Sequence, residues 1–264
     1  VLDTPVGPPA PNNPIALPVE ALSIDLHEVS FSYTSRLDNE DDDLPVLRNI
    51  NLHIPPRQHI ALVGSSGSGK TTLARLIARL ADPTIGSVSI SGINLKRVAN
   101  DDLRNRLVVV PQEPFLFADS IANNLLFANP AATKADIENV FNQLELSDWV
   151  SNLPNGIETH VGQRGAALSA GERQLVALAR AALKNPDVLI LDEATSAVDA
   201  IAEVRLAKAL QVLSRGRTTI SIAHRLSTAA RADRVVVLEH GVVNEDGSHE
   251  QLLENNLGYA KIYA

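Results

Sequence analysis

The stretch HIALVGSSGSGKTT, residues 59–72, decides the fold of this 264-residue chain. It opens with an apolar run of the length of a buried strand and passes at Gly64 into a turn rich in glycine and serine. Apolar spacing then predicts a helix from about Lys70 to Leu80. A strand, a glycine-rich loop and a helix in this order are the context that the phosphate-binding pattern G-x-x-x-x-G-K-[ST] requires.

The glycine-rich loop is suited to phosphate groups. Its glycines let backbone N–H groups curve around phosphate oxygens without a clash from Cβ atoms. We predict that Lys70 reaches the β- and γ-phosphates of a nucleotide and that the Thr71 hydroxyl ligates Mg²⁺. The alternative is a turn before an amphipathic helix that binds nothing. The predicted nucleotide contacts of the loop are Gly64, Ser65, Ser66, Gly67, Ser68, Gly69, Lys70, Thr71 and Thr72.

Strands and helices alternate along the rest of the chain. Predicted strands include SVSISG, RLVVVPQ, DVLILD, TTISIA and RVVVLEHG, with helical patterns among them. This alternation predicts an α/β fold with a largely parallel core sheet. Residues from about 119 to 154 are mostly helical in pattern. The insert from about 119 to 184 is too long for one crossover, so we expect a helical subdomain there.

Four polar residues follow predicted strands. Asp192 ends the apolar run VLIL, at the strand edge where α/β sheets bind ligands. We expect Asp192 to bind Mg²⁺ and Glu193 to orient or deprotonate an attacking water. Gln112 can contact both Mg²⁺ and that water, and His224 can donate a hydrogen bond to a γ-phosphate. Taken singly, each residue is also compatible with a purely structural role.

A second helix start, in GAALSAGERQLVALARAAL (residues 165–183), is unusual. Ser169 is expected to be the N-cap, with Glu172 at the spacing of a capping box. Gly171 lies in the first turn, where glycine weakens a helix. A small and positively polarised helix end of this kind suits an anion pressed against it.

Composition excludes several classes of protein. The net charge of −8 argues against a broad nucleic-acid-binding face, which needs clustered Lys and Arg. The absence of cysteine excludes disulfides and thiolate metal sites. No apolar stretch approaches the ~20 residues of a membrane span.

Prolines crowd residues 1–21 and favour an extended linker over packed structure. Because the chain starts at Val1 and contains no methionine, we expect a piece of a longer protein.

Together these features resemble the nucleotide-binding domain of ABC transporters, from about residue 22 to residue 264. The resemblance implies a P-loop NTPase fold with an antiparallel β-subdomain and a helical signature subdomain over about residues 113–184. It also implies that Tyr33 stacks on adenine. The matching motifs are the Walker A loop (Gly64–Thr71), the Q-loop (Gln112), the signature (Leu168–Glu172), Walker B with its glutamate (Val188–Glu193), the D-loop (Ser196–Asp199) and the H-loop (His224).

In this family two such domains dimerise head to tail, so the resemblance implies a second nucleotide-binding domain as partner. Ser169, Gly171 and Glu172 would then face the γ-phosphate of ATP held by the partner, and Asp199 would cross the same interface. The implied cofactors are ATP and Mg²⁺. The implied catalytic residues are Glu193, His224, Gln112 and Lys70, and the implied metal ligands are Thr71, Gln112 and Asp192.

The stretch THVGQRGAALSAGERQ resembles the loop before the signature in exporters. This implies an ATPase that drives export at the cytoplasmic face of a membrane. The chain itself would be soluble, and residues 1–21 would be the tether from a transmembrane domain. Two positions depart from the usual signature LSGGQ, Ala170 and Glu172, and Gln163 replaces a glutamate. These departures leave open a regulatory half of a heterodimeric transporter with low turnover. The acidic charge disfavours an ABC ATPase that acts on DNA or ribosomes.

Overall fold

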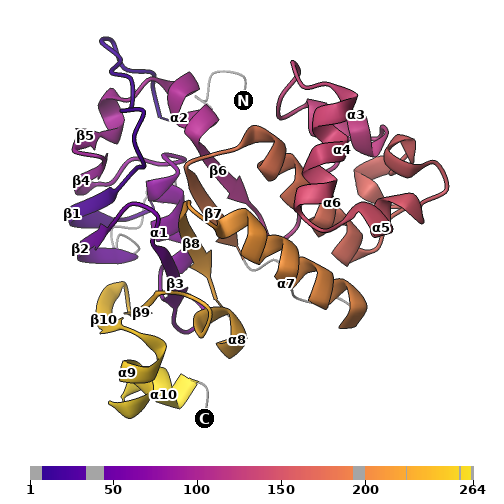
Figure 1. The fold of residues 1–264 in the computed structure, drawn as a ribbon. Coiled ribbons are helices and arrows are strands. Elements are labelled where there is room, and N and C mark those ends of the chain that lie inside the picture. Colours follow the sequence, from indigo (N-terminus) through magenta and orange to yellow (C-terminus); the bar gives the residue numbers. More distant parts are fainter. Residues whose placement is uncertain (1–7, 34–44, 193–199, 224, 256, 263–264) are drawn as a thin grey trace. The chain divides into compact units, whose positions relative to one another are not determined.

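The computed structural model describes residues 8–33, 45–192, 200–223, 225–255 and 257–262. The chain divides into two compact units (Figure 1). The first unit comprises Val1–Leu107 with Gly216–Ala264, and the second comprises Val108–Arg215. The helices expected in a subdomain over about residues 113–184 lie in the second unit. Among the helices of the described residues, none has both the length and the apolar character needed to cross a membrane.

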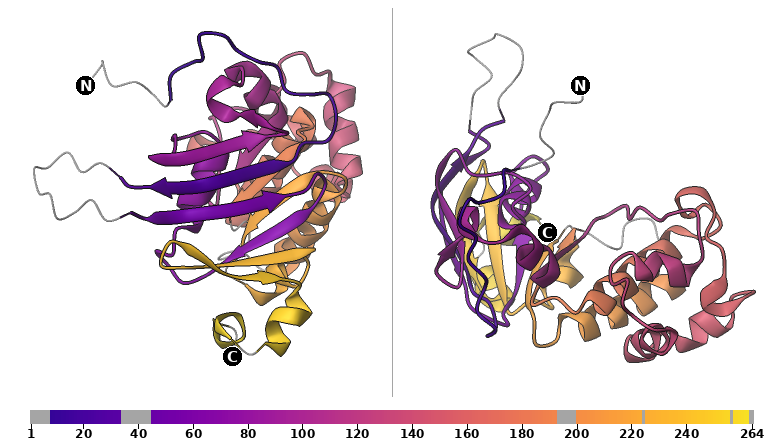
Figure 2. Two further views of the ribbon diagram at one scale, coloured as in Figure 1. Left: turned by 90° about the vertical axis from the view of Figure 1, so that its left-hand side faces the viewer. Right: turned by 90° about the horizontal axis from the view of Figure 1, so that it is seen from above.

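An antiparallel sheet forms part of the first unit. Its strands run in the order β2-β1-β4-β5, and Ile24 of β1 lies opposite Ile54 of β2 and Ile90 of β4. Apolar residues of these strands are buried on one face, as the two-residue period of a strand requires. Figure 2 shows these strands side by side in indigo and purple. The antiparallel β-subdomain is therefore confirmed. The strands are β1 (Ile24–Phe31), β2 (Leu47–Ile54), β4 (Ile85–Ile90) and β5 (Ile93–Asn94).

A second group of strands in the first unit runs in the order β10-β9-β3-β8. Strand β3 is parallel to both neighbours, with Leu62 opposite Ile222 and Val236. These three strands are almost continuously buried, as expected for parallel strands covered on both faces; β3 and β9 are mainly apolar, whereas β8 also buries Thr218, Thr219 and Ser221. The parallel core predicted from the α/β alternation is thus confirmed. The strands are β3 (His59–Val63), β8 (Thr218–Ile222), β9 (Arg234–Glu239) and β10 (Val242–Gly247).

Short helices complete the first unit. Helix α1 follows β3 after the glycine-rich loop and buries Leu73, Leu76 and Ile77 on one face. At the C-terminal end, the Tyr259 N–H donates to the Glu245 carboxylate, and its hydroxyl lies 2.7 Å from His249 Nδ1. The helices are α1 (Lys70–Ile77), η2 (Leu95–Arg97), α2 (Asn100–Arg106), α8 (Leu226–Ala229), α9 (His249–Glu254) and α10 (Gly258–Ile262).

The second unit is mostly helical around one apolar core. Phe141, Trp149, Leu175 and Leu178 are buried in this core together with Leu189 of β7. Strands β7 and β6 are neighbours in the sheet order. The elements are β6 (Leu107–Val110), α3 (Ile121–Leu126), α4 (Lys134–Gln143), α5 (Ser147–Ser151), η3 (Gly156–Glu158), η4 (Gln163–Gly165), α6 (Ala170–Lys184), β7 (Val188–Asp192) and α7 (Ala200–Ser214).

The proline-rich N-terminal segment is packed on the first unit over residues 8–22, which we call the strap. Ile15 forms an isolated parallel bridge with Val98, through the Ile15 N–H to Arg97 at 2.7 Å and the Ala99 N–H to Ile15 at 3.1 Å. Leu17 and Leu22 are buried. The sequence favoured an unpacked linker here. The strap is instead packed, because Leu17 and Leu22 are buried and its backbone carbonyl groups accept hydrogen bonds from Arg79 and Arg106.

Candidate functional site

The glycine-rich loop leads from β3 into α1, as the pattern predicts. Gly64, Gly67 and Gly69 have φ angles of 151°, 79° and 105°, which side chains other than hydrogen rarely allow. A Cβ atom on Gly64 would lie 2.1 Å from the carbonyl oxygen of Leu238, so no other residue fits there. Gly69 is the N-cap of α1 and supplies no side-chain hydrogen bond to the helix. The start of α1 is therefore shaped to accept an anion.

Lys70 directs its ammonium group into this loop. The side chain is buried, and Nζ donates to the carbonyl oxygens of Gly64 and Ser65, each at 2.8 Å. Ser68 Oγ lies 3.5 Å from the same nitrogen. A positive charge is thus fixed among the backbone groups of the loop, where a phosphate would be stabilised.

The loop is accessible at its tip and at the first turn of α1. Ser65, Ser66 and Gly67 are exposed, and so is Thr71. Ser68 and Thr72 are buried. All nine predicted nucleotide contacts thus lie in the loop and the first turn of α1, and Thr71 is exposed there.

Tyr33 lies beside the loop. Its hydroxyl is 3.1 Å from Thr72 Oγ1, and its ring packs edge to face on Phe31 with 4.9 Å between centroids. The side chain is nevertheless 47% exposed. The structure thus brings Tyr33 and the phosphate loop together within the first unit and leaves much of the ring open to a planar ligand.

The helix start in the second unit has the predicted caps. Ser169 is the N-cap of α6, and its Oγ accepts the Glu172 N–H at 3.3 Å. Glu172 Oε2 accepts the Ser169 N–H at 2.8 Å, which completes the capping box. Ser169 is exposed and Gly171 is buried. The N-cap and capping box expected from the sequence are confirmed.

Trp149 contacts this helix start and was not singled out from the sequence. Its indole Nε1 donates to Glu172 Oε1 at 3.1 Å. Trp149 is the single tryptophan of the chain and lies 23 residues before Glu172. No local pattern links the two residues; only the lone indole, which needs an acceptor when buried, could have drawn attention to it.

Gln112 and Asp192 also lie in the second unit. Gln112 is exposed and follows β6, while Asp192 ends β7 and is half-buried. The backbone carbonyl of Gln112 accepts a hydrogen bond from the side-chain amide of Gln174, a buried residue of α6. Sequence reasoning missed Gln174, although it is the second residue after the signature. Its contact ties the segment after β6 to the helix that begins at the signature.

Three predicted site residues, Glu193, Asp199 and His224, lie outside the described residues, as does Ser196 of the predicted D-loop. Within the described ranges, no group of three or more His, Cys, Asp or Glu side chains is arranged to hold a metal ion. The predicted metal ligands in these ranges are instead a hydroxyl, an amide and a carboxylate, at Thr71, Gln112 and Asp192.

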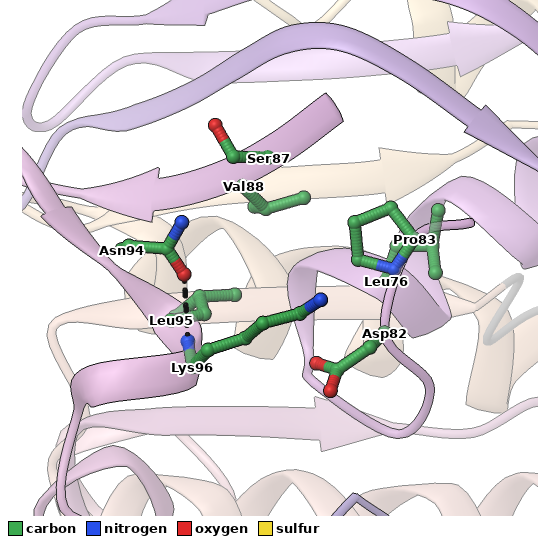
Figure 3. Close-up of a pocket in the computed structure, with 8 residues that line it drawn as sticks. All are labelled: Leu76, Asp82, Pro83, Ser87, Val88, Asn94, Leu95 and Lys96. Carbon is green, nitrogen blue, oxygen red and sulfur yellow. Dashed lines mark hydrogen bonds between the residues drawn. The ribbon is translucent and has the colours of Figure 1, made fainter. Parts of the chain in front are cut away.

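A pocket in the first unit is lined by Leu76 of α1 and by one charge of each sign, Asp82 and Lys96 (Figure 3). The Lys96 N–H donates to Asn94 Oδ1 at 2.9 Å along its wall. The space that these residues enclose has room for about one water molecule. The phosphate loop is therefore the better candidate for ligand binding.

Residues 47–196 match the ABC transporter family. The chain belongs to the ABC transporter family. This match includes the phosphate loop, the signature and the strand that ends at Asp192. The chain is accordingly an ATP-binding domain with the P-loop NTPase fold, and as a domain of this family it is an ATPase.

Similar proteins carry the names of exporters. Two proteins of Staphylococcus aureus, from strains bovine RF122 / ET3-1 and NCTC 8325 / PS 47, are named as multidrug export ATP-binding/permease proteins. Each is 42% identical over 241 residues, which cover 91% of this chain and 41% of the relative. A solved bacterial Atm1-family ABC exporter with ATP bound is 37% identical, with a TM-score of 0.88, over 99% of this chain and 44% of that one. The chain thus spans less than half the length of these proteins.

Proposed function

We propose that the chain is the motor domain of an ABC exporter. It binds ATP, closes head to tail on a second nucleotide-binding domain, and hydrolyses ATP to drive efflux through a transmembrane domain. The observation that carries this proposal is the buried Lys70 ammonium, fixed within the glycine loop at the start of α1. The similarity to multidrug export proteins supports drug-like substrates. A motor of this kind would lie at the cytoplasmic face of the membrane.

ATP is the substrate, and the described residues suit its two ends. Tyr33 offers a half-exposed ring beside the loop, suited to stacking on adenine. The loop from Gly64 to Thr72 offers backbone N–H groups and the Lys70 ammonium to the phosphates. Base and phosphates would thus be held by one unit of the chain.

The predicted Mg²⁺ ligands fit a hard cation. Thr71 presents an exposed hydroxyl, and Gln112 and Asp192 offer amide and carboxylate oxygens, which are the donors that Mg²⁺ prefers. When bound, Mg²⁺ neutralises part of the charge on the phosphates. Thr71, Gln112 and Asp192 would hold it in place.

The signature would act on the nucleotide of the partner domain. Ser169 is exposed at the N-terminus of a 15-residue helix, whose dipole favours negative charge. We assign the Ser169 hydroxyl and the backbone near Gly171 to the γ-phosphate of the partner's ATP, and Asp199 to the same interface. ATP would then join the two domains, and its hydrolysis would release them.

Hydrolysis would proceed by in-line attack of water on the γ-phosphate. Glu193 orients or deprotonates the water, and Gln112 contacts the same water. His224 donates a hydrogen bond to the γ-phosphate. Lys70 and the partner's signature stabilise the charge that spreads over the γ-oxygens in the transition state.

The test is light scattering of the Glu193→Gln chain with and without Mg-ATP. We expect the variant to bind ATP, to lose most of its turnover and to form a dimer only when ATP is present. The Glu138→Gln variant is a matched control, because Glu138 is an exposed residue of α4. Near-normal hydrolysis by Glu193→Gln would contradict the role of Glu193.

A regulatory half-site with low turnover is the second candidate, and the signature residues Ala170 and Glu172 are the observation that favours it. Magnesium-dependent phosphate release separates the two candidates. Turnover by the unaltered chain supports the motor, whereas ATP-dependent dimerisation without phosphate release supports the regulatory half.

A further inference from the structure

We propose that Trp149 is a positioning residue for the signature motif, and that Glu172 is its matched partner. By donating its indole N–H to Glu172, Trp149 holds the start of α6 in the form that acts on the partner's nucleotide. This inference rests on the proposed function, because the signature has a ligand only in the ATP-joined dimer.

The first step is the burial of Trp149. The side chain is 4% exposed, in the core of the second unit, with its ring centroid 6.1 Å from that of Phe141. An indole nitrogen can only donate, so a buried Trp requires an acceptor. Glu172 Oε1 supplies it at 3.1 Å. The side chain of Glu172 is therefore anchored to a rigid part of the helical unit.

The second step leads from Glu172 to Ser169. The other carboxylate oxygen, Oε2, accepts the Ser169 N–H at 2.8 Å, and Ser169 Oγ accepts the Glu172 N–H at 3.3 Å. A serine hydroxyl has one hydrogen to donate. Since its oxygen accepts from Glu172, that hydrogen can be donated to a phosphate oxygen of the partner's ATP. The orientation of Ser169 thus depends on Glu172, and through it on Trp149.

The third step explains the departure from LSGGQ. Both oxygens of Glu172 face N–H donors, one from Trp149 and one from Ser169. A glutamine has a single carbonyl oxygen and would turn its own NH₂ toward one of these donors. The glutamate therefore fits this site better than glutamine. Its negative charge is also opposed by two N–H groups and by the N-terminus of α6, which reduces its repulsion of a triphosphate.

The experiment is performed on the Glu193→Gln chain. Dimerisation with Mg-ATP is followed by light scattering, and ATP affinity is measured separately by equilibrium dialysis at concentrations below dimerisation. We expect Trp149→Phe to weaken ATP-dependent dimerisation by roughly tenfold, the effect of losing one hydrogen bond to a charged group. ATP affinity should not change, because the chain's own phosphate loop is untouched.

The control for packing is Phe141→Leu. This substitution replaces the phenyl ring that neighbours Trp149 in the same core by a smaller aliphatic side chain. It leaves the hydrogen bond to Glu172 in place. It should lower the melting temperature without changing the dimerisation constant. If Phe141→Leu weakens dimerisation as much as Trp149→Phe does, general destabilisation accounts for the effect and the positioning role is wrong.

A spectroscopic readout tests the hydrogen bond itself. With a single tryptophan, the ¹⁵N-labelled chain gives one indole N–H signal in NMR. That signal should move in Glu172→Gln and stay in place in Glu138→Gln, which changes an exposed carboxylate of α4. An indole signal that is identical in Glu172→Gln and in the parent would overturn the pairing.

The remaining outcomes separate the two proposals. If the parent dimerises with Mg-ATP and Trp149→Phe dimerises equally well, the positioning role is overturned and the proposed function stands. If the parent binds ATP but never dimerises, head-to-tail closure of this chain is overturned, and the role of Trp149 in it is overturned as well.

Discussion

The hydroxyl of Tyr33 lies 3.1 Å from the hydroxyl of Thr72, the third residue of α1. The aromatic side chain that follows β1 is thus tied to the helix that follows the phosphate loop. The contact is made by the phenolic hydroxyl group, while Tyr33 as a whole remains nearly half exposed. Ring and hydroxyl can therefore have separate roles, one for the ligand and one for the loop.

This separation predicts different effects of two substitutions. Tyr33→Phe keeps the ring and loses the contact with Thr72, so ATP affinity should stay within about twofold while stability falls by about 1 kcal/mol. Tyr33→Ala should weaken ATP binding by roughly tenfold or more, as for the loss of one stacked base. Equilibrium dialysis with ATP measures the change. Binding of tripolyphosphate, which has no base, is the control and should be equal in both variants.

Lys70→Ala should abolish measurable ATP binding at concentrations that saturate the unaltered chain. The substitution removes the only side-chain ammonium that any contact in the described structure fixes within the loop, and charge-assisted bonds to phosphate are strong. The matched control is Lys134→Ala, an exposed lysine at the start of α4. An unchanged ATP titration for Lys70→Ala would refute the assignment of the loop.

Arg79→Met should lower the free energy of unfolding by about 2–4 kcal/mol, because it removes three hydrogen bonds of a buried guanidinium, one of them to the buried carbonyl of Val98. The Arg79 guanidinium donates to Val98 O at 3.3 Å, to Asn100 Oδ1 at 3.0 Å and to Pro9 O of the strap at 2.9 Å. Urea unfolding gives the change.

The control for Arg79 is Arg104→Met, since Arg104 is exposed on α2. It should change stability by no more than about 0.5 kcal/mol. Limited proteolysis adds a local readout: cleavage within residues 8–22 should be faster in Arg79→Met than in Arg104→Met. Equal cleavage would show that Arg79 does not hold the strap.

The burial of His59 should make the free energy of unfolding depend on pH. Burial lowers the pKa of His59 below its usual value, against the opposing influence of Asp233, and Nε2 lies 2.8 Å from Ser221 Oγ. Between the folded pKa and about 6.5, the unfolded chain binds a proton that the folded chain does not. The free energy of unfolding should therefore fall as pH decreases below about 6.5, until the folded pKa is reached.

His59→Gln should flatten this part of the stability curve in urea unfolding at a series of pH values. His27→Gln is the control, because His27 is exposed on β1. A slope below pH 6.5 that survives in His59→Gln would assign the effect to another group.

The phosphate loop could be predicted from the sequence because its determinants are local. Glycines at positive φ, a preceding apolar run and a following helix all lie within residues 59–77, and the capping box of Ser169 and Glu172 spans four residues. Local backbone preference and side-chain reach fix such features.

The contacts that escaped prediction join distant residues. Trp149 and Glu172 are 23 residues apart, and Arg79 and Pro9 are 70 apart. Prolines in the strap favoured an extended backbone, but no spacing rule says which surface such a segment meets. The same limit applies to Gln174, whose partner Gln112 lies 62 residues earlier.

The strap is held chiefly through its backbone. Arg79 binds the carbonyl of Pro9, and Arg106 binds the carbonyls of Pro18 and Glu20. Every amino acid carries a backbone carbonyl group, so the hydrogen bonds from these arginines depend on where the backbone lies and not on which side chains it carries. Val19, for instance, is 96% exposed. Most strap positions should therefore tolerate substitution, whereas replacing either arginine or one of the few apolar residues that reach the core should detach the strap.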